Sequence, residues 1–392
     1  MSPAQSIAVI SWLPNWLSLV IGIAIVLGTA SSVMRSLVVT RGMRSILATT
    51  VDRIIRAVII IIARRFKNYE TRDGIQSWMA PLFLVGILLI WLLCFLIGYT
   101  FLLNGSNDFD FWTSMREAGS SLFTLGFASS DRTQLTIVDF IAAATGPIVI
   151  GLMISYLPTL YSAYSRREVT VALLKPIGGE PSWGPEILAR DTLVGVGRHK
   201  LTDIWADWER WGADVSESHS TYTVLIFTRS ARANRNWLVS LLAVMDSAAM
   251  TLALNPSEQQ APARMLLRQG VECVYSVADA LGLKFDRNPD PDNESDLQAD
   301  EFGQAVAMLD SLGYHRERSA EDAWPYFQQW RVMYEDPMYQ ILKIIDAVPA
   351  KWSGPRVPHT PEIPPLRQRY IINNPDGSIS PMSAVNRIFK RG

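Results

Sequence analysis

Residues 109–128 of the 392-residue chain read Phe-Asp-Phe-Trp-Thr-Ser-Met-Arg-Glu-Ala-Gly-Ser-Ser-Leu-Phe-Thr-Leu-Gly-Phe-Ala. Residues 111–123 are typical of a short helix, which then gives way to a Thr-x-Gly-aromatic run. A helix of this length is about 20 Å long, too short to cross a hydrocarbon core of about 30 Å. It suits a re-entrant descent to the middle of a bilayer, where irregular backbone must be buried in protein or line an aqueous path. We therefore predict that residues 124–128 line a pore.

Two long apolar segments flank this stretch. Residues 78–103 contain no charged residue, and residues 140–164 are followed at once by Arg166, Arg167 and Glu168. Both segments are long enough to span a bilayer. We predict an outer helix at 78–103, a short re-entrant helix at 111–123 and an inner helix at 137–165, which together form a domain at 78–165.

A further span is predicted near the N-terminus, in residues 1–40. No charged residue occurs before Arg35, and residues 16–33 are apolar enough to cross a membrane. A cleaved signal peptide is the alternative. The segment has no basic region before its apolar core and is long for a signal peptide, so we interpret it as a retained transmembrane helix.

Basic residues set the expected orientation, because Lys and Arg collect on the cytoplasmic side of a membrane protein. They are concentrated in residues 41–77 and directly after the third apolar segment. We therefore expect a multi-pass protein of the cell membrane, with its N-terminus outside and its C-terminus in the cytoplasm. The apolar run at 54–63 is too short to span alone and has Arg on both sides. We predict an interfacial helix there, although a fourth span remains the alternative.

The loop after the short helix resembles the pore of the potassium-channel superfamily, whose filter is of the type T-V-G-Y-G and lies between a pore helix and an inner helix. Thr124, Leu125, Gly126 and Phe127 match that filter in order, and Ala128 stands where the family has Gly. In such a filter, backbone carbonyls replace the hydration shell of the cation. The resemblance covers about residues 79–165.

This resemblance implies a homotetramer in a lipid bilayer, because one filter segment per chain needs four chains to complete a ring. It implies K⁺ binding at Thr124, Leu125, Gly126 and Phe127, as a permeant ion and without a cofactor. Ala128 puts selectivity in doubt, since a methyl group at a position that often needs positive φ costs about 1 kcal/mol. We expect Na⁺ to permeate beside K⁺.

Three residues of the predicted inner helix are candidates for gating. Gly146 and Gly151 can allow bending or close approach, and Pro158 removes a helical hydrogen bond near the inner end. The alternative is that Gly and Pro are simply more frequent in membrane helices.

The remainder of the chain is typical of a helical cytoplasmic domain at 166–348, followed by a Pro-rich tail at 349–392. Helical periodicity predicts helices within 236–254, 265–281 and 302–312, and Ser319 followed by Asp322 predicts a capped helix over 320–347. We also expect a strand or a continued helix at 221–228 and a loop at 286–300. Trp205, Trp208 and Trp211 should form an aromatic face that packs on a neighbouring helix or on the membrane.

Other function classes are disfavoured. The net charge of −1 gives no field to attract nucleic acid, and the two cysteines and four scattered histidines give no metal or disulfide framework. No catalytic motif is present, so we expect no enzyme. The sequence favours a cation channel that is gated by its cytoplasmic domain, with an unknown regulatory ligand or protein. The alternative is a membrane-anchored signalling or interaction protein whose pore hairpin is degenerate and does not conduct.

Overall fold

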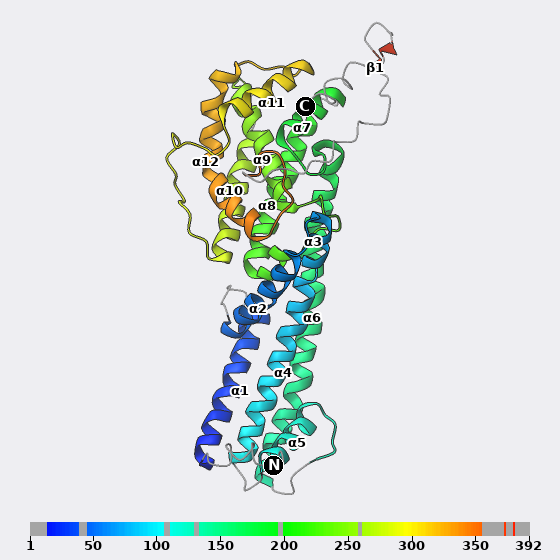
Figure 1. Ribbon diagram of the computed structural model, residues 1–392, viewed down its shortest axis with the longest axis vertical. Helices are drawn as coiled ribbons and strands as arrows, with labels where there is room; N and C mark the ends of the chain where they lie inside the picture. The colour runs from blue at the N-terminus through cyan, green and yellow to red at the C-terminus, as the bar shows by residue number, and fades with distance from the viewer. Residues whose placement is uncertain are drawn as a thin grey trace. The chain divides into compact units, whose positions relative to one another are not determined.

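A computed structural model describes residues 14–38, 45–105, 110–128, 133–194, 199–257 and 261–354, together with two short strands. The protein is mainly helical (Figure 1) and divides into two units, residues 1–162 and residues 163–392. The strands β1 (Ile372–Asn373) and β2 (Ile379–Ser380) pair antiparallel within the Pro-rich tail. The rest of the tail after Gly354 lies outside the described residues, as do residues 1–13 of the predicted N-terminal segment.

In unit 1, helix α1 (Asn15–Leu37) packs antiparallel against α4 (Met79–Gly105), as Figure 1 shows. Glycine allows the two backbones to approach closely. A Cβ atom at Gly22 would lie 2.8 Å from the carbonyl oxygen of Gly98. Further along the pair, the indole nitrogen of Trp91 donates a hydrogen bond of 2.9 Å to the hydroxyl of Ser32. The predicted N-terminal helix is therefore tightly joined to the predicted outer helix.

Two further helices precede α4. Helix α2 (Ile46–Ala63) begins eight residues before the predicted interfacial helix, and its Ile55 packs against α4 at Gly86. The hydroxyl of Ser45 caps its first turn by accepting from the Ala48 N–H. The short helix α3 (Tyr69–Gln76) follows. That α2 lies in the membrane interface stays a prediction.

Four helical segments of the described residues are long and apolar enough to cross a membrane: Asn15–Leu37, Tyr69–Gly105, Leu135–Gly178 and Trp237–Leu254. The chain thus has the helices of a multi-pass membrane protein. The fourth segment differs from the others, because 94% of its apolar window is buried inside unit 2. A helix that is apolar on all sides lies either in a membrane or in a large core, and this one forms a core.

Helix α6 (Thr133–Gly178) contains 46 residues and crosses the boundary between the two units. The prediction that the inner helix ends at 165 is wrong. Arg166 to Glu168 end the apolar segment, but Arg, Glu, Leu and Lys are good helix formers and do not end the helix. The helix stops at Gly179, which has φ of 75° and donates its N–H to the carbonyl of Lys175.

Unit 2 is built around helix α9 (Trp237–Leu254), whose first turn is capped by the side chain of Asn236. The other helices surround or extend this core (Figure 1). They are α7 (Gly184–Val194), α8 (His199–Thr221), α10 (Ala261–Leu281), α11 (Ala299–Ser311) and α12 (Ala320–Ile344).

Several sequence predictions for unit 2 agree with these helices. The hydroxyl of Ser319 caps α12 by accepting from the Asp322 N–H, as the sequence indicates, although α12 ends three residues early. Residues 221–228 are neither a strand nor a continued α-helix. The chain leaves the helix at Tyr222, with ψ of 76°, and forms the 3₁₀ helix η3 (Thr223–Phe227).

The three tryptophans of α8 are buried against neighbouring helices of unit 2. The indole nitrogen of Trp205 donates to the hydroxyl of Ser247 in α9. That of Trp211 donates to the carbonyl of Arg167 in α6, and Trp208 packs on Trp211 with ring centroids 4.5 Å apart. Of the two alternatives for this aromatic face, packing on helices is the one observed.

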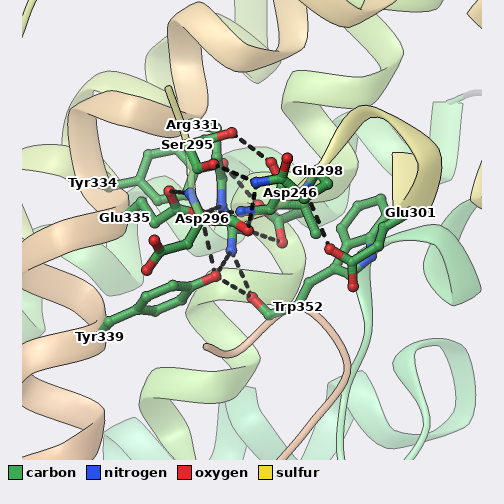
Figure 2. Close-up of polar contacts among 11 residues, drawn as sticks. Asp246, Ser295, Asp296, Gln298, Glu301, Arg331, Tyr334, Glu335, Tyr339 and Trp352 are labelled. Atoms are coloured by element: carbon green, nitrogen blue, oxygen red, sulfur yellow. Dashed lines mark hydrogen bonds and ion pairs between the residues drawn. The ribbon is translucent and has the colours of Figure 1, made fainter. Parts of the chain in front are cut away.

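A buried ionic cluster joins α9, α12 and the segment after α12 (Figure 2). The Arg331 guanidinium donates to both carboxylate oxygens of Asp246, at 2.5 and 2.6 Å, and to Glu335 at 2.9 Å. It also donates to the Tyr339 hydroxyl and to the Trp352 carbonyl. All three guanidinium nitrogens therefore donate, so the cluster works as a cross-link of the core.

A second buried arginine fixes α6 within unit 2. The guanidinium of Arg167 donates to the carbonyls of Leu225 and Thr228, each at 2.8 Å, and lies 3.1 Å from Nε2 of His219. Because Arg can only donate, Nε2 must accept, and the proton of the neutral ring is on Nδ1 beside the Ser218 hydroxyl. Burial, together with the charge of Arg167, holds the pKa of His219 well below its usual value.

We predict that Arg331→Met destabilises the protein by about 3–5 kcal/mol, because it leaves Asp246 buried without its cation. Arg316→Met is the control, since Arg316 forms a half-exposed ion pair with Asp310 and should cost about 1 kcal/mol or less. Denaturant unfolding of the detergent-solubilised protein measures both. Equal losses in the two variants would contradict the importance of the cluster.

His219 predicts a pH dependence of stability. Because its pKa is lowered in the folded state, the unfolded chain binds an extra proton below about pH 6.5. The free energy of unfolding should fall by up to about 1.4 kcal/mol per pH unit below that value, and the full contribution should be present above it. Unfolding between pH 5 and 8 should be less pH-dependent in His219→Gln than in the wild type, and identical slopes would refute this. His315→Gln, at an exposed position, controls for the loss of a histidine.

Candidate functional site

The candidate site is the loop Thr124–Ala128, which follows helix α5 (Phe111–Leu122) in unit 1. Helix α5 begins after Asp110 and packs on α4 near the end of that helix (Figure 1). The last residue of α5, Leu122, contacts Gly146 in α6. Gly146 lies 13 residues into α6, or about 20 Å along its axis. Helix α5 therefore ends beside the apolar segment of α6, well beyond its first turns, and its re-entrant character stays a prediction.

Two contacts attach the end of α5 to α6. The Ser121 hydroxyl donates to the carboxylate of Asp139 at 2.7 Å. A Cβ atom at Gly146 would lie 2.0 Å from the carbonyl oxygen of Leu122, so only glycine allows this approach. Both contacts fix the position at which the chain leaves the helix.

The backbone N–H groups of the loop turn back toward the last turn of α5. The N–H of Thr124 donates to the Ser121 carbonyl at 2.9 Å. The N–H groups of Leu125 and Gly126 both donate to the Ser120 carbonyl, at 2.8 and 3.4 Å. The N–H of Ala128 donates to the Ser120 hydroxyl at 3.0 Å. Four of the five peptide units between Phe123 and Ala128 are thus held by two serines.

This pattern determines the direction of the loop carbonyls. In a planar trans peptide the C=O points opposite to the N–H. Since the four N–H groups point at the end of α5, the carbonyls of the preceding residues point away from that end. These carbonyls belong to Phe123, Thr124, Leu125 and Phe127. A run of carbonyl oxygens that faces one direction can coordinate a dehydrated cation.

The backbone dihedrals explain how consecutive peptides face the same way. Thr124 has φ of 54° and Gly126 has φ of 72°, whereas Leu125 between them does not have a positive φ. A left-handed residue beside one with negative φ can turn successive N–H groups toward one acceptor. The conformation suits Gly126, but at Thr124 it costs about 1–3 kcal/mol, which the contacts to Ser120 and Ser121 offset.

Ala128 does not have the positive φ that the resemblance to the channel filter led us to expect. It is not among the described residues with positive φ, so the expected steric cost of its methyl group is absent. Backbone strain at Ala128 therefore no longer supports the prediction of reduced K⁺ selectivity.

The loop is open to its surroundings in the single chain. The side chains of Leu125 and Phe127 are 62% and 58% exposed, and a Cβ atom at Gly126 would meet no neighbour within 4 Å. Arg116 of α5 lies 6.0 Å from the ring of Phe127. The Thr124 hydroxyl donates to the Phe123 carbonyl, which leaves its oxygen lone pairs available to a cation.

The three gating candidates differ in their surroundings. Gly146 is the contact point between α6 and α5, and this gives it a packing role beside any hinge role. Gly151 and Pro158 are exposed on α6, about 8 and 18 Å further along the helix. The helix continues through both residues. Their part in gating stays a prediction.

Sequence reasoning missed three residues of this site. Ser120 and Ser121 are small polar residues at a helix end, where serine often bonds to nearby backbone groups, and this could have indicated their role. Asp139 is an acidic residue at the edge of an apolar segment, which by itself suggests a specific partner.

Comparison with protein-family models, with curated proteins and with solved structures finds no match to this chain. The geometry of the loop is therefore the basis for a functional assignment.

We predict that Gly146→Ala disturbs the site, because its methyl group would overlap the Leu122 carbonyl. Overpacking of this kind costs about 1–3 kcal/mol. Gly151→Ala is the matched control on the same helix, since its methyl group would enter open space. Thermal unfolding in detergent should show a clear loss for the first variant and little change for the second. Equal stability of the two variants would show that α5 does not press on α6 at this point.

Proposed function

We propose that the chain is one subunit of a homotetrameric cation channel resembling potassium channels, with Thr124 to Ala128 as its ion filter. The observation that carries this proposal is the set of hydrogen bonds from the loop N–H groups to Ser120 and Ser121, which turn the loop carbonyls away from α5. Three consecutive residues, Phe123 to Leu125, and then Phe127 after one gap offer carbonyl oxygens on the side away from α5. A cation can exchange its water shell for such oxygens, and K⁺ is the ion we expect.

The exposure of the loop supports the assembly of several copies. At the depth of Gly146, irregular backbone facing lipid would leave polar groups unsatisfied at a cost of several kcal/mol each. In a ring of four chains, the carbonyls would face a central ion path, and the exposed Leu125 and Phe127 side chains would be covered by protein. A single chain offers only one side of such a path.

Helix α6 supports gating by unit 2. It runs without interruption from the loop side of unit 1 into unit 2, where Arg167 is fully buried and held by the carbonyls of Leu225 and Thr228. A rearrangement of unit 2 on binding a ligand or a protein would act on α6 directly, because the chain is continuous. The basic segments favour a cytoplasmic location for unit 2 in a cell-membrane protein, with the N-terminus outside.

Gly126→Asp tests this proposal. The substitution places a carboxylate where the carbonyls should converge, and Asp tolerates a left-handed backbone better than most residues. Protein reconstituted in liposomes should show K⁺ flux for the wild type and only background flux for Gly126→Asp, with both proteins tetrameric. Gly303→Asp is the control, because Gly303 in α11 also has open space around its Cα and should leave the flux unchanged.

The outcomes separate the candidate functions. Wild-type flux from an assembled Gly126→Asp protein would refute the filter assignment. A wild-type protein that is not tetrameric and carries no flux would instead favour a membrane-anchored interaction protein with a degenerate pore hairpin.

A further inference from the structure

Ser120 holds the middle and the last residue of the loop Thr124–Ala128, by two different atoms. Its backbone carbonyl accepts the N–H groups of Leu125 and Gly126, and its side-chain hydroxyl accepts the N–H of Ala128. Ser120 itself is only 1% exposed, so its side chain is enclosed by protein. The carbonyl contact is available to any residue at this position, whereas the contact to Ala128 needs the hydroxyl.

We infer that Ser120 is a positioning residue for ion selectivity, whose hydroxyl orients the Phe127 carbonyl at the outer end of the loop. This inference rests on the proposed channel function. The Phe127 carbonyl and the Ala128 N–H belong to the same peptide unit, so fixing the N–H fixes the carbonyl. Backbone strain does not fix it, because Ala128 does not have positive φ.

Loss of the hydroxyl frees this peptide unit to rotate. An N–H shielded from water and left without a partner costs about 1–3 kcal/mol, and rotation relieves that cost if the N–H finds water in the ion path. The rotated peptide directs its N–H toward the ions and its carbonyl away from them. Repeated in four copies, this change removes one ring of oxygen ligands and replaces it with dipoles that repel cations.

The inner part of the loop does not depend on the hydroxyl. The peptides that carry the Thr124 and Leu125 carbonyls are held by the backbone carbonyl of Ser120, which remains after any substitution. Ser120→Ala should therefore still conduct cations but discriminate poorly between K⁺ and Na⁺. A merely structural role in folding would lower the amount of active protein and leave the ratio of permeabilities unchanged.

Reversal potentials of reconstituted protein under a K⁺/Na⁺ gradient test the inference. Ser120→Ala should lower the K⁺/Na⁺ permeability ratio by about tenfold, which corresponds to one hydrogen bond. Ser120→Cys, which keeps the size but offers a weak acceptor, should also lower it, and Ser120→Thr, which keeps the hydroxyl, should preserve it. Ser114→Ala is the matched control in α5, because the Ser114 hydroxyl is buried and has no hydrogen-bond partner among the described residues.

The results distinguish this inference from the proposed function. A conducting wild type with the same permeability ratio in Ser120→Ala and Ser120→Cys would overturn the role of Ser120 and leave the channel proposal intact. A wild type without flux would overturn both. An equal loss of selectivity in Ser114→Ala would also overturn the inference, since it would trace the effect to packing of α5. Amide hydrogen exchange at Ala128 should be faster in Ser120→Ala than in Ser114→Ala, and equal rates would contradict the proposed hydrogen bond.

Discussion

The geometry of the candidate site depends on the unpaired carbonyls at the end of α5. The last four carbonyls of an α-helix have no partner within the helix, so they need donors from outside it. The loop supplies the missing donors, because Thr124, Leu125 and Gly126 turn their N–H groups onto Ser120 and Ser121. The outward direction of the loop carbonyls follows from this requirement. The left-handed Thr124 is tolerated for the same reason, since the bonds to the helix end hold the strained residue in place.

Helix α6 contacts the candidate site in unit 1 and continues into unit 2. On the loop side it touches α5 through Gly146 and Asp139, and beyond residue 162 its Arg167 is enclosed by carbonyl and aromatic groups. Neither residue can be replaced without loss. Gly146 must lack a Cβ atom to approach α5, and Arg167 must offer several guanidinium donors to its buried partners. The helix therefore has a defined fit in each unit, and α6 is the element through which the two units are covalently continuous.

Much of the fold could be predicted from apolar runs and charge positions, because long uncharged segments such as 78–103 have few alternatives to a membrane helix. The capping role of Ser319 at the start of α12 could also be predicted from the sequence. The C-terminal end of α6 could not be predicted from the sequence. A change from apolar to charged residues marks where an apolar environment ends, and a helix can continue beyond it. The role of Ser120 could not be read either. It depends on a bond between residues eight positions apart, and neither periodicity nor composition reports the path of a loop.

Helix α9 has a consequence for the synthesis of the protein. By hydropathy alone it could be taken for another membrane span, yet it is the most enclosed helix of unit 2. Insertion of α9 would carry the residues after it to the opposite side of the membrane. Asp246, at the middle of the helix, opposes this, because a carboxylate at the centre of a bilayer helix costs about 2.5–3.5 kcal/mol. Once unit 2 has folded, the same carboxylate is neutralised by Arg331. One acidic residue thus helps both to keep the nascent helix out of the membrane and to fix its place in the finished core.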